Sequence, residues 1–206
     1  QHTSHRLRIK GNALYPTPTQ EGTISWVEYA LDGSYSVVSY KDGTEISRTT
    51  IERDKEVHGM AWDNTTQAIY LLITDDDGMH IAKLQNQTLL PVTRPAYTTL
   101  SDLKAKDGKL YFGSIASGRD ELHYYDLATD REYRISTSKY GSFSPTPIDS
   151  TRVLATSYDY RGYLPVIQQM NDTLEVEYAP HPPHLVLPKT KPWGVVNLDT
   201  MRFDVV

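Results

Sequence analysis

Four short apolar segments recur along the chain at nearly constant spacing, and this repeat limits the possible folds more than any other feature. The segments begin at Ile24, Ile69, Leu110 and Val153, so their starts lie 45, 41 and 43 residues apart. Each segment is rich in β-branched or aromatic residues and is too short for a helix, which predicts a strand. The spacing therefore predicts one structural unit that is built several times.

Turn-forming residues border each apolar segment. Asp107–Gly108 precedes the third segment and Asp32–Gly33 follows the first. Such pairs supply the positive φ angles of tight hairpins. A second strand is expected after the turn that follows each apolar segment. A third turn and strand are clearest at 128–135. One further short strand is expected before each unit, at 15–18, 58–62, 101–103 and 144–147. Each unit is therefore predicted to contain four antiparallel strands joined by hairpins.

A four-stranded sheet alone leaves both of its faces exposed to water. Sheets that repeat around an axis cover one another, and a repeat of about 40–45 residues with four strands is typical of a propeller. The 15 tyrosines suit pleated, half-buried surfaces, and no window of ten or more residues has convincing helical periodicity. We therefore predict an all-β fold, a β-propeller with four recognisable blades and a partial fifth. An irregular β-sandwich is the alternative.

The expected organisation follows the repeat. Residues 1–180 carry the propeller, with an outer strand at about 5–9 and blades at about 13–50, 57–93, 98–137 and 140–178. A Pro-rich linker is expected at 181–192, followed at 193–206 by strands that complete a fifth blade or lead into a further domain. Because the chain begins with Gln1, we expect a product of processing after secretion or a part of a longer polypeptide.

Charge and composition exclude several classes of protein. The net charge is −5, which argues against a nucleic-acid partner and against a polybasic membrane binder. The chain has no cysteine, so it has neither disulfides nor thiolate metal sites. No apolar run approaches about 20 residues, the length that a transmembrane helix needs.

One unit resembles a known repeat. Residues 106–114, with Asp107–Gly108 before an apolar strand, and the hairpin at 119–127 resemble the TolB-type propeller repeat, as does the stretch from Arg6–Leu7 through 12–24. The resemblance covers about residues 5–180. It implies relatives that are periplasmic binding scaffolds, or propellers attached to tricorn-like and prolyl-oligopeptidase-like peptidases. It also implies an exported protein, in the periplasm or at the outer membrane or cell surface of a Gram-negative bacterium.

No catalytic, metal or cofactor site is predicted within this chain. The Gly-x-Ser-x-Gly motif of serine hydrolases and the His-Glu-x-x-His motif of zinc proteases are both absent. His80 and His123 occupy equivalent repeat positions, which favours a packing role over a metal pair. Asp75–Asp77 is interpreted as a solvated turn, because the spacing of an EF-hand is absent.

Ligand-binding residues are expected where the blades converge, because propellers bind partners at the central channel or at the loops of one rim. The first strands contribute the candidates Thr17, His58, Asp102 and Thr146, and the rim loops contribute Arg119, Tyr160 and Arg161.

These candidates predict a non-catalytic binding or scaffolding domain that presents loops to a peptide, a protein or a glycan. The alternative is a propeller that gates substrate for a hydrolase or peptidase domain outside this chain. A glycosidase or lyase would need two carboxylates across a pocket, and Asp102 alone does not supply that pair.

Overall fold

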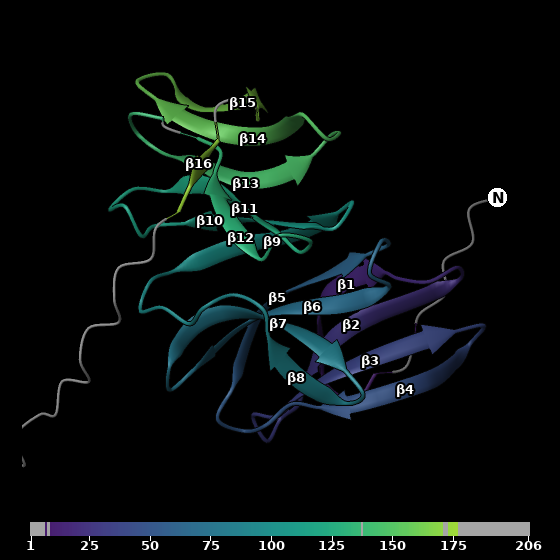
Figure 1. The fold of residues 1–206 in the computed structure, drawn as a ribbon. Helices are drawn as coiled ribbons and strands as arrows, with labels where there is room; N and C mark the ends of the chain where they lie inside the picture. The colour runs from purple at the N-terminus through teal and green to yellow at the C-terminus, as the bar shows by residue number, and fades with distance from the viewer. Residues whose placement is uncertain (1–6, 8, 137, 171–172, 177–206) are drawn as a thin grey trace, which may run out of the picture.

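The computed structural model describes residues 7, 9–136, 138–170 and 173–176 (Figure 1). Every regular secondary-structure element in this part of the chain is a β-strand. The strands form four antiparallel sheets, which we call blades 1 to 4. The all-β prediction is therefore confirmed. No helix with the length and hydropathy needed to cross a membrane occurs among the described residues.

The blades follow one another along the chain. Blade 1 consists of β1 (Asn12–Pro18), β2 (Thr23–Tyr29), β3 (Tyr35–Lys41) and β4 (Thr44–Thr50). Blade 2 consists of β5 (Glu56–Asp63), β6 (Ala68–Asp75), β7 (Gly78–Gln85) and β8 (Thr88–Pro91). Blade 3 contains β9 (Leu100–Lys106), β10 (Lys109–Ser114), β11 (Glu121–Asp126) and β12 (Arg131–Arg134). Blade 4 contains β13 (Ser142–Pro147), β14 (Arg152–Asp159) and β15 (Gly162–Gln169).

Alternation along the strands gives each blade two faces, and these faces build a core at every junction between blades. Val27 of blade 1 packs with Leu71 of blade 2, and Leu72 on the opposite face of blade 2 packs with Phe112 of blade 3. Tyr111 then packs with Val153 of blade 4. The first strands lie innermost, with β1 against β5, β5 against β9 and β9 against β13 (Figure 1). This face-to-face stacking confirms the β-propeller.

The fourth unit differs from the predicted four-stranded pattern. In the described residues blade 4 has three strands, and β16 (Leu174–Glu175) pairs instead with β12 of blade 3, where Glu175 lies opposite Tyr133. The outermost strand of a sheet offers unpaired N–H and C=O groups, and β16 covers those of β12. No strand of blade 4 packs on blade 1 within the described part of the chain.

Several predicted segments lie outside the described residues. They are the linker at 181–192, the strands at 193–206 and most of the outer strand at 5–9. Of that outer strand only residues 7 and 9 are described, and neither belongs to a strand of the structure.

Candidate functional site

Each innermost strand carries a β-bulge at the same place. The register shifts lie between Leu14 and Thr17 in β1, between Val57 and Gly59 in β5, opposite Phe112 in β9, and between Phe143 and Thr146 in β13. One residue in each bulge occupies the equivalent position in its blade, and we call this set the inner-strand row: Tyr15, His58, Asp102 and Ser144.

The backbone at the row is unusual. Tyr15, Asp102 and Ser144 have positive φ angles of 53°, 55° and 53°, in the left-handed region that residues other than glycine seldom adopt. Such a conformation costs on the order of 1–3 kcal/mol and persists only where the surrounding structure imposes it. A bulge also redirects its side chain, and bulges are frequent beside functional sites. The four side chains of the row are all exposed.

All four side chains of the row carry polar groups, and a hydrogen bond connects two of them across neighbouring blades. Ser144 Oγ donates a hydrogen bond to Asp102 Oδ2 at 3.0 Å, across the junction of blades 3 and 4. His58 Nε2 lies 3.7 Å from Glu56 Oε2. The row therefore presents a phenol, an imidazole, a carboxylate and a hydroxyl on the innermost strands of four successive blades.

Two of the four channel residues expected from the sequence belong to this row, His58 and Asp102. Thr17 lies two residues beyond Tyr15, is half-buried, and donates from Oγ1 to the Tyr15 carbonyl at 2.9 Å. Thr146 lies past its own bulge, is exposed, and pairs opposite Leu154.

The sequence did not lead us to place Tyr15 and Ser144 among the channel residues. Their spacing of about 43 residues from His58 and Asp102 was available as a signal, but the two-residue offset from the threonines depends on the bulges, which no local pattern marked.

The three rim residues are not gathered into one site by any contact of the described structure. Arg161 pairs with Asp159 in its own hairpin at 2.8 Å, which lowers the pKa of Asp159. Tyr160 is 92% exposed, with the Arg161 guanidinium 5.5 Å from its ring centre. Arg119 instead lies beside Glu121 of β11, with Nη2 3.6 Å from Oε1.

The two equivalent histidines do not meet. His80 lies opposite Ile73 on the face of blade 2 that packs on blade 1, whereas His123 lies opposite Phe112 on the face of blade 3 that packs on blade 2. Blade 2 therefore separates the two rings. Among the described residues no three His, Asp or Glu side chains are grouped to hold a metal ion. The Asp75–Asp77 turn is closed by the Asp77 N–H, which donates to Asp75 Oδ1 at 3.0 Å.

These sheets, stacked in sequence order around their innermost strands, define the class of protein as a β-propeller. No protein-family model matches the sequence, and no curated protein matches it. Solved structures do match. TolB from Acinetobacter baumannii gives a TM-score of 0.66 at 12% identity, with 80% of this chain and 43% of that chain covered.

Two further structures give the same result. A putative TolB from Agrobacterium tumefaciens has a TM-score of 0.58 at 14% identity, with coverage of 75% of this chain and 60% of that one. A puromycin-hydrolyzing peptidase from Mycobacterium tuberculosis has a TM-score of 0.63 at 14% identity, with coverage of 80% and 28%. The chain thus has a TolB-like propeller fold, and it spans less than two thirds of each of these proteins.

Proposed function

We propose that this domain is a non-catalytic binding propeller, and that the inner-strand row binds a peptide or protein partner. The observation that carries the proposal is the repeated bulge, which places an exposed polar side chain at the same position of four successive inner strands. A regular strand without a bulge would avoid the backbone strain at Tyr15, Asp102 and Ser144.

The chemistry of the row supports binding over catalysis. Ser144 Oγ donates directly to a carboxylate, whereas a serine nucleophile needs a base such as histidine at that position. Backbone amides of an extended peptide offer alternating donors and acceptors, which the phenol, imidazole, carboxylate and hydroxyl of the row can pair with.

Export of the protein is part of this proposal. The TolB-like fold supports a periplasmic location or one at the outer membrane or cell surface. The alternative function, a substrate-gating propeller of a larger hydrolase, is supported by the likeness to the Mycobacterium tuberculosis peptidase, of which this chain covers 28%.

Selection of peptides from a random display library tests the proposal. The affinity of selected peptides for the chain is then measured by fluorescence anisotropy. We expect His58→Ala and Asp102→Asn each to weaken binding at least tenfold, and asparagine is chosen because it tolerates the positive φ at residue 102. Glu21→Ala, in an exposed turn of blade 1, is the control and should leave the affinity unchanged. Equal affinities for all three variants and the wild type would overturn the proposal.

A further inference from the structure

A second polar site lies at the outer edge of blade 3, away from the inner-strand row. It is a pocket of about 420 Å³ between the loop that precedes β11, the strands β11 and β12, and the segment that contains β16. Its lining comprises Ala116, Ser117, Glu121, His123, Arg134, Leu174, Glu175 and Val176. The volume falls within the range of about 300–1,000 Å³ that is usual for small-molecule sites.

The pocket contains buried charge that the protein leaves incompletely paired. Glu121 is 1% exposed, yet its Oε1 atom has no hydrogen-bond partner among the described residues, and the same holds for the buried Nε of Arg134. The two side chains approach each other only through Arg134 Nη1 and Glu121 Oε2, at 3.4 Å. Arg119 Nη2 lies 3.6 Å from Glu121 Oε1, an ion-pair separation that is too long for a good hydrogen bond.

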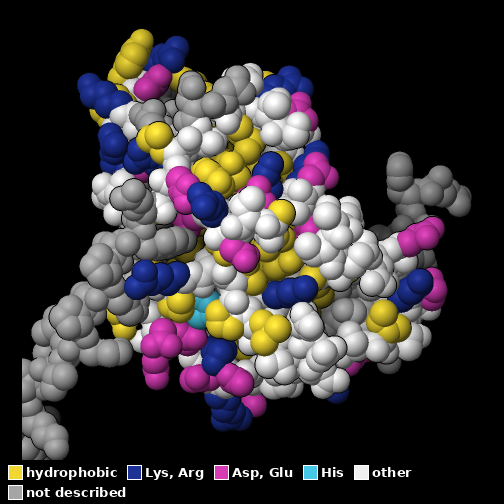
Figure 2. Space-filling model, viewed as in Figure 1, with side chains coloured by type: hydrophobic (Ala, Val, Ile, Leu, Met, Phe, Trp, Pro, Cys, Tyr) yellow, Lys and Arg dark blue, Asp and Glu magenta, His cyan; other side chains and the backbone are white. Residues whose placement is uncertain are grey.

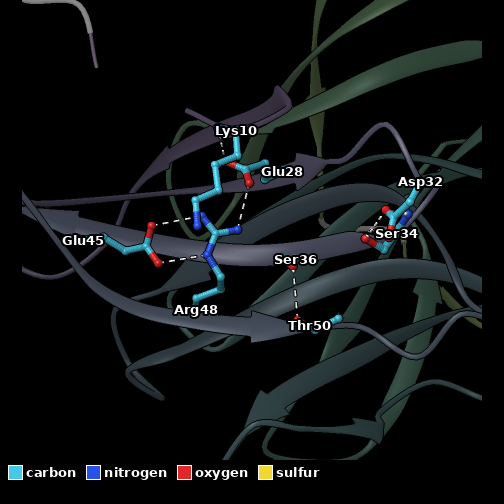
Figure 3. Close-up of polar contacts among 8 residues, drawn as sticks. All are labelled: Lys10, Glu28, Asp32, Ser34, Ser36, Glu45, Arg48 and Thr50. Atoms are coloured by element: carbon cyan, nitrogen blue, oxygen red, sulfur yellow. Dashed lines mark hydrogen bonds and ion pairs between the residues drawn. The ribbon is translucent and has the colours of Figure 1, made fainter. Parts of the chain in front are cut away.

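Blade 1 shows how this fold completes such a pair. Glu28 is 3% exposed, and its Oε1 accepts from Arg48 Nη1 at 2.8 Å while Oε2 accepts from the Lys10 N–H at 3.3 Å (Figure 3). Arg48 also donates from Nε and Nη2 to both oxygens of Glu45, each at 2.9 Å. Burial alone would raise the pKa of Glu28, but Arg48 and the Lys10 N–H lower it overall.

The contrast between the two pairs singles out the pocket. Burying a charged group without hydrogen bonds costs several kcal/mol per ion, so native proteins complete such groups with partners. Glu28 and Arg48 have theirs within the protein, whereas Glu121 Oε1 and Arg134 Nε both belong to residues that line a pocket. Both atoms have less than 1 Å² of accessible surface, so a ligand in the pocket can pair with them only when the Arg134 side chain, which is 30% exposed, turns to admit it.

His123 adds a third polar group. Its Nδ1 lies 2.6 Å from Glu132 Oε1, which fixes the orientation of the ring. The charged lining residues and their ion-pair partners are balanced, with Glu121, Glu132 and Glu175 against Arg119, Arg131 and Arg134. Charges of both signs are also interspersed on the face shown in Figure 2. A near-neutral site of this kind disfavours strongly ionic ligands.

We propose that this pocket binds a neutral saccharide. As the Arg134 side chain turns to admit the sugar, one of two vicinal hydroxyls donates to Glu121 Oε1 and its neighbour accepts from the Arg134 guanidinium, because a hydroxyl does both. The apolar surfaces of Ala116, Leu174 and Val176 can pack on the C–H groups of the sugar ring. Since the pocket lies at the outer strands of blade 3 and the row lies on the innermost ones, this proposal stands or falls independently of the proposed function.

Titration calorimetry with the full chain tests the proposal, with the methyl glycosides of glucose, galactose, mannose and N-acetylglucosamine as probes. We expect saturable binding of at least one of them, weakened at least tenfold by Glu121→Gln and by Arg134→Lys. Glu28→Gln, the matched change in the completed pair of blade 1, should leave the affinity unchanged.

Ser117→Trp provides a second test that leaves the buried charges intact, because this exposed residue lines the pocket and a bulky side chain would fill it. It should abolish binding in a chain whose thermal unfolding is unchanged. Absence of saturable binding by all four glycosides would overturn the proposal. Binding that Ser117→Trp leaves intact would also overturn it.

Discussion

Asp63 Oδ1 accepts a hydrogen bond from the backbone N–H of Gly108 at 3.0 Å, and this contact joins the end of β5 in blade 2 to the β9–β10 hairpin of blade 3. The other carboxylate oxygen accepts from the N–H and the Oγ1 of Thr66, both at 2.8 Å. Asp63 is fully buried. One carboxylate therefore closes a turn within its own blade and also fixes the position of the next blade.

We expect Asp63→Ala to lower the free energy of unfolding by about 3 kcal/mol. The substitution leaves the donors of Thr66 and Gly108 without their charged acceptor. Urea denaturation followed by tryptophan fluorescence measures the change. Asp76→Ala, in an exposed turn, is the control and should stay within about 0.5 kcal/mol of the wild type. A loss in Asp63→Ala no larger than in this control would contradict the role of the contact.

Gly78 is predicted to be irreplaceable for a steric reason. Its φ is +116°, and an added Cβ would lie 2.6 Å from the carbonyl oxygen of Ala96, which bonds to Met79 beside it. We expect Gly78→Ala to lower the melting temperature strongly. Gly118→Ala is the matched control, since Gly118 has a φ of +85° with nothing within 4 Å of the added Cβ, and it should show only the smaller backbone cost. Similar melting temperatures for the two variants would show that the contact with Ala96 relaxes freely.

Most of the fold was predictable because its information is local. The Asp107–Gly108 turn has positive φ at both residues, 53° and 75°, as a two-residue hairpin requires, and both residue types favour it. The choice of β16 between the edges of β12 and β15 was not predictable. Both edges offer the same backbone groups, so the outcome depends on tertiary geometry that the short segment at Leu174 does not encode.

The sites were less predictable than the strands. The repeat placed His58 and Asp102 on inner strands, but the bulges that expose Tyr15 and Ser144 have no local sequence signature, so Thr17 and Thr146, just past the bulges, were chosen instead. Glu121 gave no signal either, because a polar residue in a strand usually faces solvent, and its burial depends on how β11 packs within the assembled propeller.

Alkaline pH should destabilise the domain through its buried tyrosines. Burial raises the pKa of Tyr111 to about 12, above the usual value of about 10. The folded state therefore holds this proton more tightly than the unfolded state, so the contribution to stability is complete below about pH 10 and is lost as the pH rises towards 12. We expect the urea midpoint to fall between pH 8 and pH 11, and to fall less in Tyr111→Phe. Tyr160→Phe, at a residue that is 92% exposed, should behave as the wild type does, and an equal fall in all three proteins would contradict the assignment to Tyr111.

The outward face of blade 4 is expected to bind a hydrophobic dye. Two cross-strand pairs, Leu154 with Ile167 and Tyr158 with Tyr163, lie on this face, and all four side chains are between 41% and 69% exposed. Contiguous exposed apolar surface is unusual in a soluble domain and attracts apolar ligands. We expect Leu154→Lys combined with Ile167→Lys to reduce the fluorescence of added anilinonaphthalene sulfonate, with little change in stability because neither side chain belongs to the core. Ile46→Lys, at an exposed position of β4, is the control. An equal reduction in this control would place the dye elsewhere on the molecule.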